Sequence, residues 1–311
     1  MKRILTLLLV LSLSLSLCAC GAAQESDSGK LTIVTTVFPA YDFARQIAGE
    51  RAEVTLLLPP GAEAHSFEPT ARDLLRIRGC DLFFCNGGES EAWADTLLAG
   101  QDAPVNSLRM LECVEALEEE IPEGMQADEE PGEDGPEYDE HVWTSPVNAI
   151  AICRALTDCL CAIDPDGAAV YAANCESYCA ALAELDQAFR DVVAEGQRRT
   201  VIFADRFPVR YFVEEYGLQY YAAFPGCAED TEPAAGTVAF LIDKVRAEGV
   251  PAVFTIEFSN EKLADAVCED TGCRKLLFHS CHTVSADALR EGVSYLALMR
   301  GNLDSLREAL S

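Results

Sequence analysis

From residue 31 onward, the chain alternates short apolar, β-branched runs with segments whose apolar positions recur every three or four residues. The first pattern is typical of buried strands and the second of amphipathic helices. The strand-like runs fall into two groups, at 31–37, 52–58 and 81–87, and at 200–204, 219–224, 251–257 and 274–280. Because strands and helices alternate within each group, we expect an α/β fold with two Rossmann-like (βα) lobes, each built on a mainly parallel sheet.

The segment 146–196, between the two groups, contains no strand-like run. It opens with a Ser-Pro helix start and continues into a long Ala-rich amphipathic pattern that ends at Gly196. This pattern predicts two helices, the second about 30 residues and roughly 45 Å long at the usual rise per residue. We therefore expect a rigid helical spine that joins an N-terminal lobe at 31–145 to a C-terminal lobe at 197–311.

The first nineteen residues have the form of an export signal, with two positive residues followed by an apolar stretch at 4–17. This stretch is too short for an ordinary membrane span. It ends in "LCAC", which resembles the bacterial lipobox, so we expect 1–19 to be a lipoprotein signal peptide and Cys20 to be lipidated. Residues 20–30 are then a flexible tether to the outer face of the bacterial cell membrane. Ordinary secretion without a lipid is the alternative.

The formal net charge of the chain is −29, and it becomes −31 once the positive residues of the signal are removed. A protein this acidic repels nucleic acid and favours cations as binding partners, so we expect no nucleic-acid partner. Residues 112–140 hold fourteen Asp or Glu and no Lys or Arg. We expect an acidic, disordered surface loop there, either a solvated insertion or a weak collector of cations.

Cysteine is frequent, with fourteen residues, two of them in the signal and lipobox. The other twelve show no CxxC spacing of the kind found in zinc ribbons. Most are expected to serve as small buried residues. Cys227 and Cys281 form the one pair that we expect to be a candidate disulfide.

Polar residues that can bind a metal follow several of the predicted strands. His65, Asp205, Glu257 and His279 each come after a strand-like run, and His141 precedes the predicted spine. In open α/β sheets, ligands bind outside the carboxyl ends of the strands, so these side chains should converge in the cleft between the lobes.

The chain has only four histidines, and three of them fall at these predicted edges. Imidazole suits Zn²⁺, and imidazole mixed with carboxylate also suits Mn²⁺ or Fe²⁺. The fourth histidine, His282, could replace or assist His279, and we expect it to contact the metal ligands rather than the metal itself. Glu257 is equally well explained as a ligand or as a buried carboxylate that accepts hydrogen bonds from backbone amides.

Several stretches resemble one known family over about residues 31–310. They are "TIVTTVFPAYDFARQIAG", "PPGAEAHSFEPTARDL", "CNGGESEAWADTL", "DEHVWTSPVNA", "EEYGL" and "DTGCRKLLFH". These stretches are similar to the zinc and manganese substrate-binding lipoproteins of ABC importers, the cluster A-I solute-binding proteins. The pairing of Gly-x-x-x-His-x-x-Glu-Pro-Thr with His-Val-Trp-x-Ser-Pro is the most specific part of the resemblance.

The family pattern implies His65 and His141 as ligands from the first lobe, and a second pair from the loops that hold Asp205 and His279. The sequence departs from this pattern where a ligand is expected and Arg206 stands instead. A guanidinium cannot bind a cation, so either Asp205 or a water takes that place. His279 stands where the family has Asp, which moves the donor set toward nitrogen and toward zinc.

The resemblance implies a monomeric binding protein, not an enzyme, that passes Zn²⁺ to an ABC permease and its ATPase, with Mn²⁺ or Fe²⁺ as the alternative cargo. A long loop at the position of the acidic segment is typical of the zinc-type members of the family. The acidic segment lacks the histidines that those members often carry there. Two other classes are a surface adhesin and a zinc hydrolase with Glu257 or Asp205 as general base, although HExxH is absent. Proton competition should weaken metal binding as the pH falls through about 6.5.

Overall fold

The computed structural model describes residues 29–100, 104–126, 138–228 and 232–311, and the residues from Leu31 to Ser311 form one unit. Within this unit each of two sheets has four parallel strands, in the orders β2-β1-β3-β4 and β6-β5-β7-β8. The expected α/β fold with two parallel-sheet lobes is therefore confirmed. The predicted signal peptide and Cys20 lie outside the described residues.

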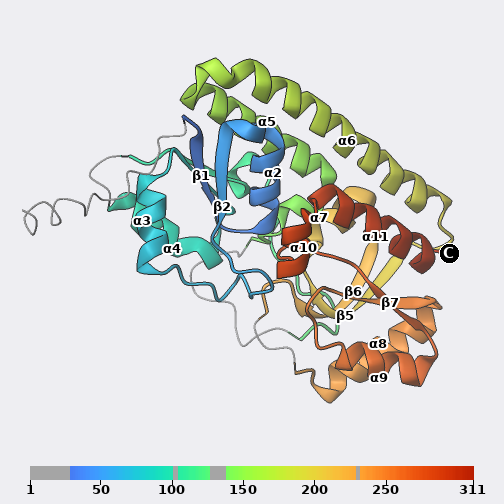
Figure 1. Cartoon of the computed structure of the whole chain (residues 1–311). Helices are drawn as coiled ribbons and strands as arrows, with labels where there is room; N and C mark the ends of the chain where they lie inside the picture. The colour runs from blue at the N-terminus through green and yellow to red at the C-terminus, as the bar shows by residue number, and fades with distance from the viewer. Residues whose placement is uncertain (1–28, 101–103, 127–137, 229–231) are drawn as a thin grey trace, which may run out of the picture. The chain divides into compact units, whose positions relative to one another are not determined.

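The first lobe consists of the sheet with the order β2-β1-β3-β4 and the helices around it (Figure 1). Its elements are β1 (Leu31–Thr35), α2 (Phe38–Ala48), η2 (Gly49–Arg51), β2 (Ala52–Leu56), α3 (Ala71–Gly79), β3 (Leu82–Cys85), η3 (Glu89–Glu91), α4 (Ala92–Ala99), β4 (Ser107–Arg109), η4 (Leu111–Cys113) and η5 (Val142–Thr144). In both sheets the strand order reverses beside the first strand, and this reversal opens the crevice where α/β proteins bind ligands.

The second lobe repeats this plan after the spine. Its elements are β5 (Thr200–Phe207), α7 (Arg210–Tyr216), β6 (Gln219–Pro225), α8 (Ala235–Glu248), β7 (Ala252–Thr255), α9 (Lys262–Thr271), β8 (Arg274–Leu277), α10 (Ala286–Glu291) and α11 (Tyr295–Ala309). All four residues of β7 and seven of the eight in β5 are buried, as expected for central strands covered on both faces.

Two helices form the predicted spine. They are α5 (Pro146–Ile163) and α6 (Ala168–Glu195), joined through η6 (Pro165–Gly167). With 28 residues, α6 is about 42 Å long. It contacts α2 of the first lobe and both α7 and α11 of the second, so the spine packs on both lobes (Figure 1). The mean hydropathy of α5 reaches 1.5, high enough for a membrane span, but its apolar face packs against α2 and α6 like a core helix.

The two lobes share one hydrophobic core. Phe38 and Trp143, from the first lobe and the start of the spine, belong to the same buried cluster as Phe254 and Phe278 of the second lobe. The indole Nε1 of Trp143 donates to the carbonyl of Ser280 at 2.8 Å, and the amide of Phe38 donates to the carbonyl of His282 at 3.2 Å. These bonds hold the loop after β8 against the first lobe, so wide opening of the cleft would break buried contacts.

The acidic segment differs from the expectation in its described part. Met125 is buried, the amide of Gln126 donates to the carbonyl of Ala223 at 2.9 Å, and the amide of Leu117 donates to the hydroxyl of Tyr211 at 3.1 Å. The expected disordered loop at 112–140 is thus corrected for residues 112–126, which lie against the second lobe, and for residues 138–140, where Asp139 and Glu140 are buried.

Two physical reasons explain this order. Leu117 and Met125 stand among the acids as apolar residues, and both pack into the shared core. In addition, two carboxylates meet cations of the second lobe, since Glu120 lies 3.3 Å from Arg210 and Glu123 lies 3.6 Å from Lys244. Residues 127–137 lie outside the described residues.

Replacing Trp143 with Phe should lower the free energy of unfolding by about 2–4 kcal/mol, because it leaves a cavity and an unpaired buried carbonyl at Ser280. The matched control is Trp93→Phe. The indole Nε1 of Trp93 is buried with no hydrogen-bond partner among the described residues, so its loss should cost about 1 kcal/mol or less. Urea unfolding followed by far-ultraviolet circular dichroism measures both, and equal losses would contradict the role given to the Trp143 hydrogen bond.

Candidate metal centre

A cavity of about 220 Å³ lies between the lobes, at the carboxyl ends of their strands. Three histidines line it: His65, His141 and His282. Their rings form a triangle, with centroids 5.3 Å apart for the first two, 5.0 Å for His65 and His282, and 5.2 Å for His141 and His282. Of the expected ligands, the structure therefore brings His65 and His141 together.

His141 is fully buried and is oriented by a carboxylate. Its own amide donates to Oδ1 of Asp139 at 2.8 Å, and its Nδ1 lies 3.1 Å from the same oxygen. The chain then enters α5, where the hydroxyl of Ser145 accepts from the amide of Asn148 and caps the helix. The Nε2 atom of His141 is buried and has no partner among the described residues. A histidine held by a carboxylate at one nitrogen, with the other nitrogen free, has the arrangement of a metal ligand.

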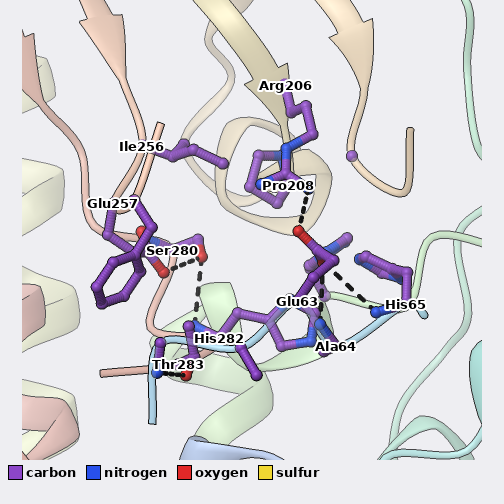
Figure 2. A pocket seen from close by; sticks show the side chains of 15 residues that line it. Glu63, Ala64, His65, Arg206, Pro208, Ile256, Glu257, Ser280, His282 and Thr283 are labelled. Atoms are coloured by element: carbon purple, nitrogen blue, oxygen red, sulfur yellow. Dashed lines mark hydrogen bonds and ion pairs between the residues drawn. The ribbon is translucent and has the colours of Figure 1, made fainter. Parts of the chain in front are cut away.

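His65 lies in the loop between β2 and α3. The carboxylate of Glu63 holds this loop by accepting from the amides of Ala64, at 3.0 Å, and His65, at 3.4 Å. The other oxygen of Glu63 accepts from Arg206 of the second lobe at 2.6 Å, so the two lobes meet at the rim of the cavity (Figure 2). Arg206, at the position where the resemblance predicts a ligand, is thus engaged with a carboxylate.

Burial and mutual repulsion keep most of this cluster neutral. Burial lowers the pKa of His65 to about 3, helped by the nearby charge of His141. Burial lowers the pKa of His282 well below its usual value, and His65 and His141 add to this shift. Burial also acts to lower the pKa of His141, but Asp139, Glu140 and Glu119 together outweigh it, and the net pKa is raised. Two imidazoles therefore offer free lone pairs, as a transition metal requires.

The structure differs from the sequence prediction at His279, which does not line the cavity. Its Nδ1 accepts from the amide of Cys281 at 3.0 Å, and its backbone groups bond to Asn302. Cys281 has a φ of 65°, in the left-handed region, so the chain turns sharply between the two histidines. His282, which we expected to support the site rather than to line it, lines the cavity.

The two carboxylates expected at the site are engaged elsewhere. Asp205 does not line the cavity, and its oxygens accept from the amides of Arg206 at 2.8 Å and Ile256 at 3.2 Å. Glu257 does line the cavity, but its two oxygens accept from the amide and the hydroxyl of Ser280 at 2.7 and 2.6 Å (Figure 2). For Glu257 this geometry favours the alternative of a buried, hydrogen-bonded carboxylate.

Cys227 was missed as a candidate for the site. Its Sγ and one nitrogen from each of His65 and His141 lie within 4.8 Å of one another. The candidate Cys227–Cys281 disulfide does not form, since both are free thiols, as are the other ten cysteines of the described residues. The signal was present in the sequence, because Cys227 follows the apolar run 219–224 just as the histidines follow theirs.

Comparisons with known proteins identify the family of the chain. The family model described as ZnuA, zinc-uptake complex component A, periplasmic, matches residues 33–309. The zinc-binding lipoprotein AdcA of Streptococcus pneumoniae is 30% identical over 292 residues, which cover 92% of this chain. The chain spans 57% of the length of AdcA. The high-affinity zinc uptake system protein ZnuA of Bacillus subtilis is 29% identical, and the match covers 92% of this chain and 89% of that protein.

Solved structures give the same result. The Zn(II)-bound ZnuA-like domain of Streptococcus pneumoniae AdcA superimposes with a TM-score of 0.76 at 27% identity, and the match covers 91% of this chain and 99% of that domain. The resemblance seen in the sequence is thereby confirmed. The family model covers most of the chain, and the chain therefore belongs to the ZnuA family of periplasmic zinc-uptake components.

Proposed function

We propose that this protein captures Zn²⁺ outside the cytoplasmic membrane and delivers it to the permease of an ABC importer. The observation that carries the proposal is the convergence of His65, His141 and His282 on one interlobe cavity. Three nitrogen donors favour Zn²⁺ over Mn²⁺, which prefers carboxylate and carbonyl oxygen. The relatives named above, a zinc-binding lipoprotein and a zinc uptake protein, support the same cargo.

The cellular setting follows from the same relatives. The family is described as periplasmic and AdcA is named a lipoprotein, which supports an extracytoplasmic protein held to the membrane by lipid on Cys20. The permease and its ATPase are the partners that a zinc-uptake component needs. The protein carries out no chemistry on its cargo, and the names of the relatives include no reaction.

The ligand roles are part of the proposal. His141 binds through Nε2, because Asp139 occupies its Nδ1, while His65 and His282 complete a set of three imidazoles. Asp205 and Glu257 act by holding the loops around the cavity, through the amides of Arg206 and Ser280. Because the lobes share a core, release requires a small displacement of one loop rather than wide opening.

A matched pair of substitutions tests the ligand set. His282→Asn should lower zinc affinity roughly 100-fold or more. Loss of a residue that only orients a metal ligand already lowers metal affinity by about 10–100-fold, and loss of the ligand itself should lower it further. His279→Asn keeps an oxygen that can accept from the Cys281 amide, and should leave affinity within about threefold. Competition with a chromophoric zinc chelator measures both. A large loss in His279→Asn with none in His282→Asn would contradict this assignment and restore the one made from the sequence.

Zinc affinity should also decrease as the pH is lowered, and this decrease should begin above pH 6.5. The pKa of His141 is raised above its usual value of 6.5, so in the metal-free protein this ring binds a proton that zinc must displace. Through this ring alone, affinity falls by up to about tenfold per pH unit below that raised pKa. In Asp139→Asn the amide oxygen still accepts a hydrogen bond but the charge is gone, so the decline should move to lower pH. Affinity that stays constant down to about pH 5.5 would contradict this role for His141.

A further inference from the structure

The three imidazoles leave one corner of a tetrahedral zinc site without a protein ligand. Where the family resemblance predicts the remaining donor stands Arg206, whose guanidinium pairs with Glu63 at 2.6 Å and has no lone pair to give. Asp205 does not fill the gap, because its oxygens accept from the backbone amides of Arg206 and Ile256. Structural zinc sites are almost always four-coordinate, so the missing donor is either a water or another side chain.

Cys227 offers a thiol on the other side of His65, in a pocket that adjoins the interlobe cavity and shares this histidine with it. It lies in the turn directly after β6, at the same edge of the second sheet as Arg206 and Glu257. Its Sγ and the nitrogens of His65 and His141 are mutually within 4.8 Å. In a tetrahedral site with ordinary Zn–N and Zn–S bonds, the ligand atoms are about 3.3–3.6 Å apart. Small side-chain rotations would therefore close this group around one ion.

Two further observations show that the group is built for a ligand. The Nε2 of His141, which is 0% exposed, has no hydrogen-bond partner among the described residues, although buried polar atoms almost always have one. In addition, Gly226 lets the turn approach this ring. A Cβ at position 226 would lie 2.9 Å from Cε1 of His141 and 3.0 Å from the carbonyl oxygen of Phe207, too close for any other residue without a shift.

We propose that Cys227 binds Zn²⁺ through its thiolate and completes a site with three nitrogens and one sulfur. This inference rests on the proposed zinc-binding function and names the donor that replaces the one lost at Arg206. On binding, a Zn–S bond forms and the thiol proton leaves to solvent, with no change in oxidation state. Thiolate is a soft ligand, so Cys227 also sharpens the preference for zinc over manganese.

X-ray absorption at the zinc edge tests this directly on the protein loaded with one equivalent of Zn²⁺, with its thiols kept reduced. The spectrum should show one sulfur at about 2.3 Å together with nitrogen at about 2.0–2.1 Å. Cys227→Ser should lose the sulfur and bind zinc at least about tenfold more weakly, since even partners that only orient a ligand contribute that much. Manganese affinity should change less, so the ratio of zinc to manganese affinity should fall.

Cys268→Ser is the matched control, because Cys268 is another partly buried thiol of the second lobe and lies beside Cys273 rather than beside a histidine. It should keep the sulfur signal and the affinity of the parent. A zinc-loaded parent with nitrogen and oxygen alone, or a Cys227→Ser variant within twofold of the parent, would overturn the inference and leave the proposed function standing. A parent that binds no zinc would overturn both.

Discussion

The pairing of buried His141 with Asp139 is the interaction on which the candidate metal centre depends. An imidazole with no exposed surface needs a partner for each nitrogen, and the described part of the chain supplies one for Nδ1 only. The surrounding elements hold the ring in this state. The 3-10 turn Val142–Thr144 follows His141 directly, and the ring of Trp143 packs with its centroid 5.5 Å from that of His141. A free lone pair in a buried, fixed position is well suited to a metal ion.

The shared core explains how two lobes can offer one preformed site. Trp143 bonds to the carbonyl of Ser280, and Phe38 bonds to the carbonyl of His282, so the loop that carries the third histidine is fastened to the first lobe. The spine contacts helices of both lobes and adds to this stiffness. A preorganised site loses little conformational entropy when it binds, which favours high affinity, and it leaves small loop movements as the route for release.

Both parallel sheets and the spine could be predicted from the alternation of apolar and helical patterns, and His65 and His141 from the rule that ligands gather at the carboxyl ends of parallel strands. The remaining features depend on local conformation and distant contacts. His282 rather than His279 reaches the cavity because Cys281 has a left-handed φ. Cys227 approaches the His141 ring because Gly226 has no side chain. The segment 112–126 is ordered by bonds to residues more than ninety positions away, whereas its composition alone predicts disorder.

If imidazoles from both lobes bind a single ion, a crystal structure of the zinc-loaded protein, with anomalous scattering recorded at the zinc edge, will show it. We expect one strong peak in the interlobe cavity, about 2.0–2.1 Å from a nitrogen of each of His65, His141 and His282. A peak bound elsewhere, for example by carboxylates of the acidic segment, with these three rings bound to no metal, would refute the proposed site.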